Sequence, residues 1–202
     1  MLKVGKLDSD LLEKIVFKKI TFRRPEVLTR PGIGEDCAVV DFGTYECVMS
    51  TDPITAAVED IGRLAIDISC NDIASNGVEP LGIMLTVMLP EGTTTADVEA
   101  IMSQAAAASE ALGVEIIGGH TEITNAVNKP IIVSTAIGRG EKWASKHRET
   151  MKPGDFILLT KTAGLEGTAI IAGDYEKDLQ GILTAEEVQQ AKAMMNHVSV
   201  VK

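Results

Sequence analysis

Three aspartates occupy positions at which a metal-binding site could form: Asp36, Asp52 and Asp72. Asp72 is the most informative because it falls near the end of a predicted helix over residues 58–75. With Ile61 at the centre of the apolar stripe, a rotation of about 100° per residue places Asp72 within about 20° of Ile61. A carboxylate on the inward face of a helix costs roughly several kcal/mol unless it is paired or metal-bound. The spacing therefore predicts a polar or metal-binding role for Asp72, and an equally compatible alternative is that the helix ends there and Asp72 emerges into solvent.

The other two aspartates lie at the ends of predicted strands. Asp52 follows the run 47–51, and Asp36 precedes a strand over residues 37–42. Such positions commonly carry active-site groups, although aspartates there also form ordinary turns. Three carboxylates beside apolar segments favour a hard cation, because Mg²⁺ is bound by one or a few carboxylates together with phosphate oxygens.

A double glycine follows a predicted strand over residues 114–118, in the segment Gly118-Gly119-His120-Thr121. Paired glycines allow the backbone to approach a phosphate or another chain closely, and His120 by itself is also compatible with a turn. The P-loop, dinucleotide-binding, nucleophile-elbow and zinc-peptidase motifs are absent from the sequence. Their absence argues against the familiar dehydrogenases, hydrolases and zinc peptidases.

The composition is that of an acidic globular protein with a sizeable core. The 202 residues are 45% apolar and carry a formal charge of −10. This charge argues against non-specific nucleic-acid binding, which requires a basic surface. The three cysteines show no C-x-x-C spacing, which predicts buried free thiols and neither a disulfide framework nor a zinc site. No apolar run approaches about 18 residues, so we expect a soluble, cytoplasmic protein without a membrane partner.

The order of predicted elements favours an α+β fold over a strictly parallel α/β sheet. The predicted helices cover residues 8–20, 58–75, 94–112, a segment from 166, and 184–196, and the predicted strands cover residues 37–42, 46–51, 81–89, 114–118, 131–137 and 155–160. A loop over residues 119–130 separates the last two strands of the first domain. A polar linker over residues 141–153 then separates an N-terminal domain, residues 1–140, from the start of a second α+β domain, residues 154–202.

Four segments in this order resemble the AIR synthase superfamily. They are GIGEDCAVVDF (32–42), STD (50–52), CNDIASNGVEP (70–80) and GGHTE (118–122). The superfamily includes aminoimidazole ribonucleotide synthase, thiamine-monophosphate kinase, selenophosphate synthetase and a hydrogenase maturation factor. Residues 154–171 resemble the opening of the second domain of that family, and residues 4–16 are most similar to the hydrogenase maturation branch.

This resemblance implies an N-terminal domain with a mixed sheet and packed helices that pairs with its twin into a β-barrel across a homodimer. ATP would lie in a cleft at that interface, with its phosphates held through Mg²⁺. The implied metal ligands are Asp36, Asp52 and Asp72, and the implied catalytic residues are Asp52, Asp72 and His120. The implied cofactor-binding residues are Asp36, Asn71, Gly118, Gly119 and Thr121.

The resemblance also implies an ATP- and Mg²⁺-dependent enzyme that activates an amide-like oxygen by phosphoryl transfer. The acceptor would be a small molecule or a peptide-borne group, and the setting would be hydrogenase maturation. One alternative is a small-molecule kinase of the thiamine-monophosphate kinase or selenophosphate synthetase type, which would use the same carboxylates. Another is a non-catalytic nucleotide-binding subunit. One departure concerns the position after the double glycine. The kinase branch usually has Asp there and AIR synthase has Glu, whereas this chain has His120, as selenophosphate synthetase does.

Overall fold

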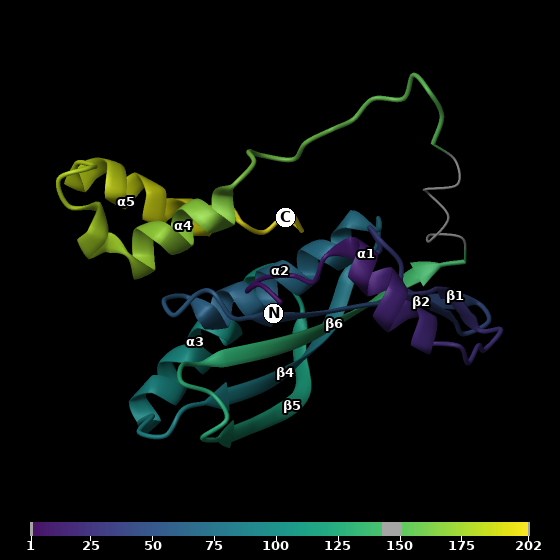
Figure 1. Cartoon of the computed structure of the whole chain (residues 1–202), viewed down its shortest axis with the longest axis horizontal. Coiled ribbons are helices and arrows are strands. Elements are labelled where there is room, and N and C mark those ends of the chain that lie inside the picture. The colour runs from purple at the N-terminus through teal and green to yellow at the C-terminus, as the bar shows by residue number, and fades with distance from the viewer. Residues whose placement is uncertain (1, 143–150, 202) are drawn as a thin grey trace.

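The centre of the fold is a six-stranded mixed sheet in the order β1-β2-β3-β6-β4-β5 (Figure 1). The structure is a computed structural model that describes residues 2–142 and 151–201. The strands are β1 (Val27–Thr29), β2 (Ala38–Asp41), β3 (Tyr45–Ile54), β4 (Pro80–Leu89), β5 (Glu115–Ile123) and β6 (Ile131–Glu141). Strands β4 and β5 pair in parallel, whereas the other neighbouring strands pair antiparallel. The predicted α+β class with a mixed sheet is confirmed.

Two helices cover one face of this sheet (Figure 1). α2 (Ile61–Ser75) packs on β3 and β6, and α3 (Thr95–Leu112) packs beside α2. The largest fully buried side chains of the resulting core include Ile61, Leu64, Ile73, Ile83 and Ile132. The opposite face carries partly exposed apolar side chains that belong to every second position of the strands. We call it the open face.

The ends of α2 and α3 follow from local chemistry. Thr94 and Asp97 form a capping box at the start of α3, and Gly113 ends the helix with a left-handed backbone. α2 begins at Ile61, later than the predicted residue 58. The reason is that Asp60 has φ 54, a left-handed conformation that cannot continue into a right-handed helix.

The prediction of a loop from Gly119 is wrong, because β5 continues through Ile123. Its parallel pairing with β4 extends to Leu89, so the backbone groups of this segment are satisfied by a neighbouring strand. The double glycine therefore lies inside a strand. The sequence pattern missed this extension because residues 118–122 contain no β-branched apolar run.

The predicted strand over residues 155–160 is also wrong. This segment has no pairing partner within the described residues, and Phe156 and Ile157 are 94% and 99% exposed. A strand requires a neighbour for its backbone hydrogen bonds, and the described C-terminal residues are otherwise helical or irregular. The predicted linker over residues 141–153 lies largely outside the described residues.

Short helices precede and follow the sheet. Residues 9–19 are helical as predicted, in α1 (Ser9–Leu11), η1 (Leu12–Val16) and η2 (Phe17–Lys19). The C-terminal helices are α4 (Leu165–Asp174), η4 (Glu176–Leu179), α5 (Ala185–Ala193) and η5 (Met194–His197). We call residues 161–201 the C-terminal unit, which lies beside α2 on the side away from the sheet (Figure 1). None of the helices in the described part of the chain is both long and apolar enough to cross a membrane.

Candidate active site

The structure brings Asp72 and Asp52 together beside β3, with the backbone of Asp36 close by. Asp72 projects from α2 towards this strand, where the Ser50 hydroxyl donates a 2.7 Å hydrogen bond to its Oδ2. The same hydroxyl lies 3.1 Å from the backbone carbonyl oxygen of Asp36. The carboxyl groups of Asp72 and Asp52 are within hydrogen-bonding reach of each other. Of the two alternatives for Asp72, the structure supports the inward one.

The electrostatics of this site are those of crowded carboxylates. Burial raises the pKa of Asp72 to about 7, and the hydrogen bond from Asp52 and the negative charges of Asp52 and Asp36 act in the same direction. The hydrogen bond from Ser50 opposes them. None of the ion pairs found between described residues includes Asp36, Asp52 or Asp72. The site therefore holds negative charge that a bound cation would compensate.

The negative charges of this site also affect two further ionisable groups, Cys37 and Glu166. The Cys37 thiol donates to the backbone carbonyl of Asp72 at 3.3 Å, and burial together with the nearby carboxylates raises its pKa to about 12. Cys37 is therefore a thiol at neutral pH and not a nucleophile. Glu166, in the first turn of α4, has a raised pKa because of partial burial and the charge of Asp52. No local pattern in the sequence signals Glu166, since only the docking of α4 brings it near the site.

A cleft of about 250 Å³ lies beside Asp36 and Ser50. Its lining also includes Glu35, Thr51 and Thr135, so it extends from Asp36 to the open face. This volume is smaller than the roughly 300–1,000 Å³ of typical ligand pockets. A larger hollow of about 460 Å³ lies at the start of α3, but its lining includes none of the clustered aspartates. We take the smaller cleft as the candidate site because its lining includes Asp36 and also Ser50, whose hydroxyl donates to the carboxyl group of Asp72, the pKa of which is raised.

The donor set fits a partial magnesium shell. Within residues 2–142 and 151–201, no group of three or more His, Cys, Asp or Glu is arranged so that it could hold a metal ion by itself. Mg²⁺ commonly takes only one or two protein carboxylates and completes its shell with water and phosphate oxygens. The adjacent carboxyl groups of Asp52 and Asp72 match that requirement. The assignment of Asp36, Asp52 and Asp72 as metal ligands stays a prediction.

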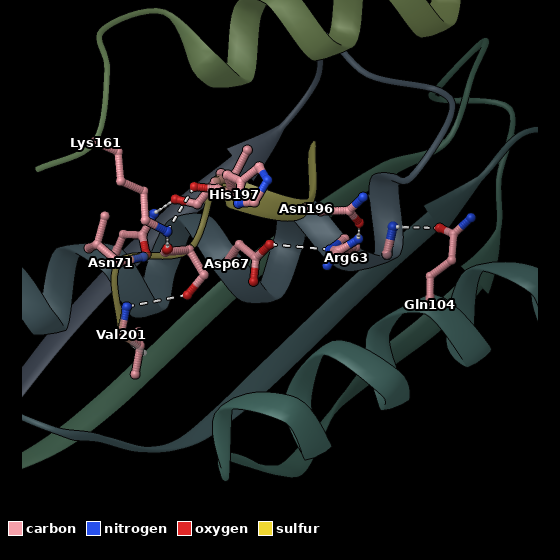
Figure 2. Close-up of polar contacts among 12 residues, drawn as sticks. Arg63, Asp67, Asn71, Gln104, Lys161, Asn196, His197 and Val201 are labelled. Atoms are coloured by element: carbon pink, nitrogen blue, oxygen red, sulfur yellow. Dashed lines mark hydrogen bonds and ion pairs between the residues drawn. The ribbon is translucent and has the colours of Figure 1, made fainter. Parts of the chain in front are cut away.

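Asn71 does not face the carboxylates. Its side-chain amide points towards the C-terminal unit (Figure 2). Nδ2 donates to the carbonyl oxygen of Val198 at 3.0 Å, and Oδ1 accepts from the backbone amide of Val200 at 2.7 Å. Both polar atoms of the amide are thus engaged by main chain. The predicted cofactor-binding role of Asn71 gains no direct contact with the site in this conformation.

The double glycine lies far from the carboxylates of the same chain. The registers of the sheet place Asp52 opposite Ser134, Ser134 opposite Leu85, and Leu85 opposite Gly119. Gly119 is therefore in the same row as Asp52 but three strands away, or about 14 Å at the usual strand spacing. Gly118 and Thr121 lie on the same edge strand.

His120 lies on the open face, whereas Asp52 faces the helices. It pairs with Thr86, whose neighbours Leu85 and Val87 are buried on the helix side. Its Nε2 is 3.2 Å from Oε2 of Glu122, and its side chain is largely exposed. The structure does not bring His120 to the carboxylates within one chain, and its predicted catalytic role stays a prediction.

Gly119 has a packing reason to be glycine. A Cβ atom at this position would lie 1.9 Å from the carbonyl oxygen of Leu85, whereas one at Gly118 would meet nothing within 4 Å. We expect Gly119→Ala to lower the free energy of unfolding by about 2–4 kcal/mol, and Gly118→Ala by only about 1 kcal/mol from its positive φ. Urea denaturation of both variants measures the difference. Equal losses would contradict this packing role.

Comparison with known proteins identifies the fold and the site region together. Residues 34–140, which contain all the predicted site residues, match the N-terminal domain of the AIR synthase related protein family. The chain belongs to this family. Its predicted superfamily is thereby confirmed, and the AIR synthase-related domain contains β2 to β6 with α2 and α3.

The relatives of this AIR synthase-related chain fall in the hydrogenase maturation branch. A protein of Methanocaldococcus jannaschii named as a hydrogenase expression/formation protein is 29% identical over 87% of the chain and 55% of its own length. Carbamoyl dehydratase HypE of Rhodobacter capsulatus is 28% identical over 83% of the chain and 50% of its own length. A crystal structure from Thermus thermophilus superposes with a TM-score of 0.69 at 21% identity, covering 95% of this chain and 62% of that one. The chain spans about half the length of these curated relatives.

Proposed function

We propose that this chain binds Mg²⁺–ATP at the Asp36, Asp52 and Asp72 site and activates an amide-like oxygen by phosphoryl transfer, in hydrogenase maturation. The carboxyl pair of Asp52 and Asp72 carries the proposal, because burial and mutual repulsion leave it short of positive charge. Family membership supports nucleotide use. The name of the Rhodobacter capsulatus relative, a carbamoyl dehydratase, supports a carbamoyl group as the acceptor.

The residues of the chain would act by binding the cation and by orienting the groups that bind it. Asp52 and Asp72 would bind the cation, and Ser50 would fix the orientation of the Asp72 carboxylate through its 2.7 Å hydrogen bond. When bound, Mg²⁺ neutralises charge that develops on the phosphate oxygens. The terminal phosphorus–oxygen bond to ADP breaks as a bond forms to the acceptor oxygen. The carbon–oxygen bond to the phosphate then breaks, and both protons of the acceptor NH₂ group are released, which gives free phosphate and a dehydrated product with a carbon–nitrogen triple bond. No side-chain nucleophile is needed.

We also propose that the site is completed by a second copy of the chain across the open face. The cleft of about 250 Å³ extends from Asp36 to Thr51 and Thr135, whose side chains lie on that face. His120 lies on the same face, so a second copy could approach it while the carboxylates of its own chain cannot. A homodimer could thus bring His120 of one copy close to the carboxylates of the other.

Calorimetry with Mg²⁺–ATP, followed by phosphorus NMR with a carbamoyl-bearing peptide, tests this function. We expect binding that EDTA abolishes, then ADP and free phosphate together with a dehydrated peptide. A phosphorylated small molecule such as thiamine diphosphate, formed from thiamine monophosphate, would instead favour the kinase alternative. Nucleotide binding without turnover of either acceptor would favour a non-catalytic subunit.

A further inference from the structure

The polar stripe of α2 faces the C-terminal unit and is not a solvated face. Arg63, Asp67 and Asn71 follow one another at four-residue intervals, so they lie along one side of the helix. The sequence suggests that Arg63 and Asp67 belong to a solvent-facing surface, yet Asp67 is only 3% exposed. Figure 2 shows this stripe lying against residues from the end of the chain.

Two side chains hold the main chain of the segment that begins at the last residue of η5. We call this segment, residues 197–201, the strap. Asn71 donates to one strap carbonyl and accepts from one strap amide, whereas the Lys161 ammonium donates to two strap carbonyls. The atoms bound are, in chain order, the carbonyl oxygens of His197 (2.9 Å from Lys161 Nζ), Val198 and Ser199 and the amide nitrogen of Val200. Four successive residues are thus recognised through backbone atoms.

The neighbouring contacts fix the position of the strap on α2. Arg63 donates from Nη1 to Oδ1 of Asn196 at 2.7 Å, and its Nε lies 3.6 Å from Oδ2 of Asp67. The positive charge of Lys161 also acts on Asp67. Val198 joins the main hydrophobic core with 7% of its surface exposed. The strap is therefore anchored by charge, main-chain hydrogen bonds and burial together.

Lys161 adopts an unfavourable backbone conformation at this contact. Its backbone has φ 59, a left-handed conformation that residues with a Cβ atom adopt rarely. Such a conformation persists where surrounding contacts over-determine it. Here the side chain of Lys161 bridges two strap carbonyls, and the same residue begins the C-terminal unit.

The C-terminal unit has a second attachment at the other end of α2. The carboxylate of Asp174, the last residue of α4, accepts from the backbone amides of Val58 and Glu59 at 2.9 Å each. The first turn of α4 places Glu166 in the field of Asp52. The unit is thus fastened at both ends of the helix that carries Asp72, and the first turn of α4 is near enough to Asp52 for Glu166 to be affected by its charge.

We propose that Asn71 and Lys161 form a latch that holds the strap and thereby keeps α4 closed beside the carboxylate site. Asn71 is then a positioning residue that acts on the site through the strap and does not touch the ligand. The consequence for nucleotide binding rests on the proposed function. The latch and its coupling to α4 do not.

Amide hydrogen exchange on the full chain tests the latch in Asn71→Ala and Lys161→Met. Methionine retains the Cβ atom and the approximate length of Lys161, so the backbone preference is unchanged. We expect the Val200 amide to exchange about tenfold faster or more in both variants. The amides of Val58 and Glu59, at the far end of α2, should also exchange faster because α4 is released.

Matched controls make the same substitutions at exposed positions away from the strap, with Asn125→Ala and Lys177→Met. These should leave all three amides unchanged, as should the β3 and β6 core amides in every variant. Exchange at Val200 within twofold of wild type in both latch variants would overturn the latch. Faster exchange at Val200 alone, with Val58 and Glu59 unaffected, would overturn the coupling to α4. Absence of Mg²⁺–ATP binding by wild type would defeat the proposed function and leave these exchange results valid.

Discussion

Asp72→Asn is expected to abolish Mg²⁺–ATP binding while leaving the fold at least as stable as wild type. The asparagine keeps an oxygen that can accept from the Ser50 hydroxyl, so the local packing is retained. It loses the negative charge that a magnesium ion requires. Asp52→Asn should show the same loss, because the two carboxyl groups are adjacent. Calorimetry measures binding, and unchanged ATP affinity in both variants would refute the metal-site assignment.

The stability of Asp72→Asn relative to wild type should depend on pH when EDTA keeps the site free of metal. The pKa of Asp72 is raised from 3.8 to about 7 in the folded state, so between these values the folded chain binds more protons than the unfolded chain. Wild-type stability attributable to Asp72 therefore falls as pH rises from about 4 to about 7. The variant has no such loss. A pKa raised this far corresponds to about 4 kcal/mol for a fully buried group, but Asp72 is only partly buried, so its advantage should be on the order of 1 kcal/mol at pH 8 and near zero at pH 4.

Thermal unfolding across this pH range measures the effect. Asp178→Asn is a suitable control, since it removes one charge from an exposed residue of η4. A variant that is less stable than wild type at pH 8 would mean that Asp72 serves the fold and not a ligand. Stability gained by removing a charged group is the signature of a group retained for function.

Periodicity and capping located most of the fold because they are local properties. The Thr184–Glu187 spacing predicts the capping box that begins α5, and a threonine cap is predicted where Thr94 begins α3. The inward position of Asp72 follows from the same arithmetic, since a helix face is determined by spacing alone. What spacing could not supply was the identity of the partner, which is Ser50 on a strand 22 residues away.

The features that sequence reasoning missed all depend on contacts between distant segments. The glycines of β5 lie in a strand because β4 offers a parallel edge, which no local pattern reveals. Asn71 is turned towards the strap, 127 residues along the chain. Glu166 is affected by the charge of Asp52 only because α4 docks on the same side of the sheet. Motif resemblance grouped His120 with the aspartates, whereas the strand register places it on the opposite face. Local patterns predict elements, and topology decides which of their side chains meet.

A charge on the open face is expected to separate the proposed homodimer into monomers. This face presents a hollow of about 310 Å³ lined by side chains that include Phe42, Tyr45, Leu81 and Ile137. Phe42 and Leu81 are 72% and 57% exposed. Contiguous exposed apolar surface of this kind marks an association site in soluble proteins. Burying it against a second copy would remove this surface from water and complete the cleft beside Asp36.

Ile137→Glu tests the association directly. Ile137 pairs with Met49 in the middle of the sheet, so a glutamate there would be buried without a partner in the dimer but solvated in the monomer. We expect the dimer dissociation constant to rise by about 100-fold or more, which corresponds to roughly 3 kcal/mol. Sedimentation equilibrium measures it, with circular dichroism to verify folding. Ile182→Glu, at a 74% exposed site in the C-terminal unit, should leave association unchanged.

Two results would distinguish the open face from other routes to association. A wild-type chain that sediments as a monomer at all concentrations would exclude a barrel-type dimer and require the cleft to be completed within one chain. A dimer that persists in Ile137→Glu would place the interface elsewhere. If Ile137→Glu is monomeric and also fails to bind Mg²⁺–ATP, the site requires both copies of the chain. His120, which lies on the open face away from the carboxylates of its own chain, would then be a residue through which the second copy contributes.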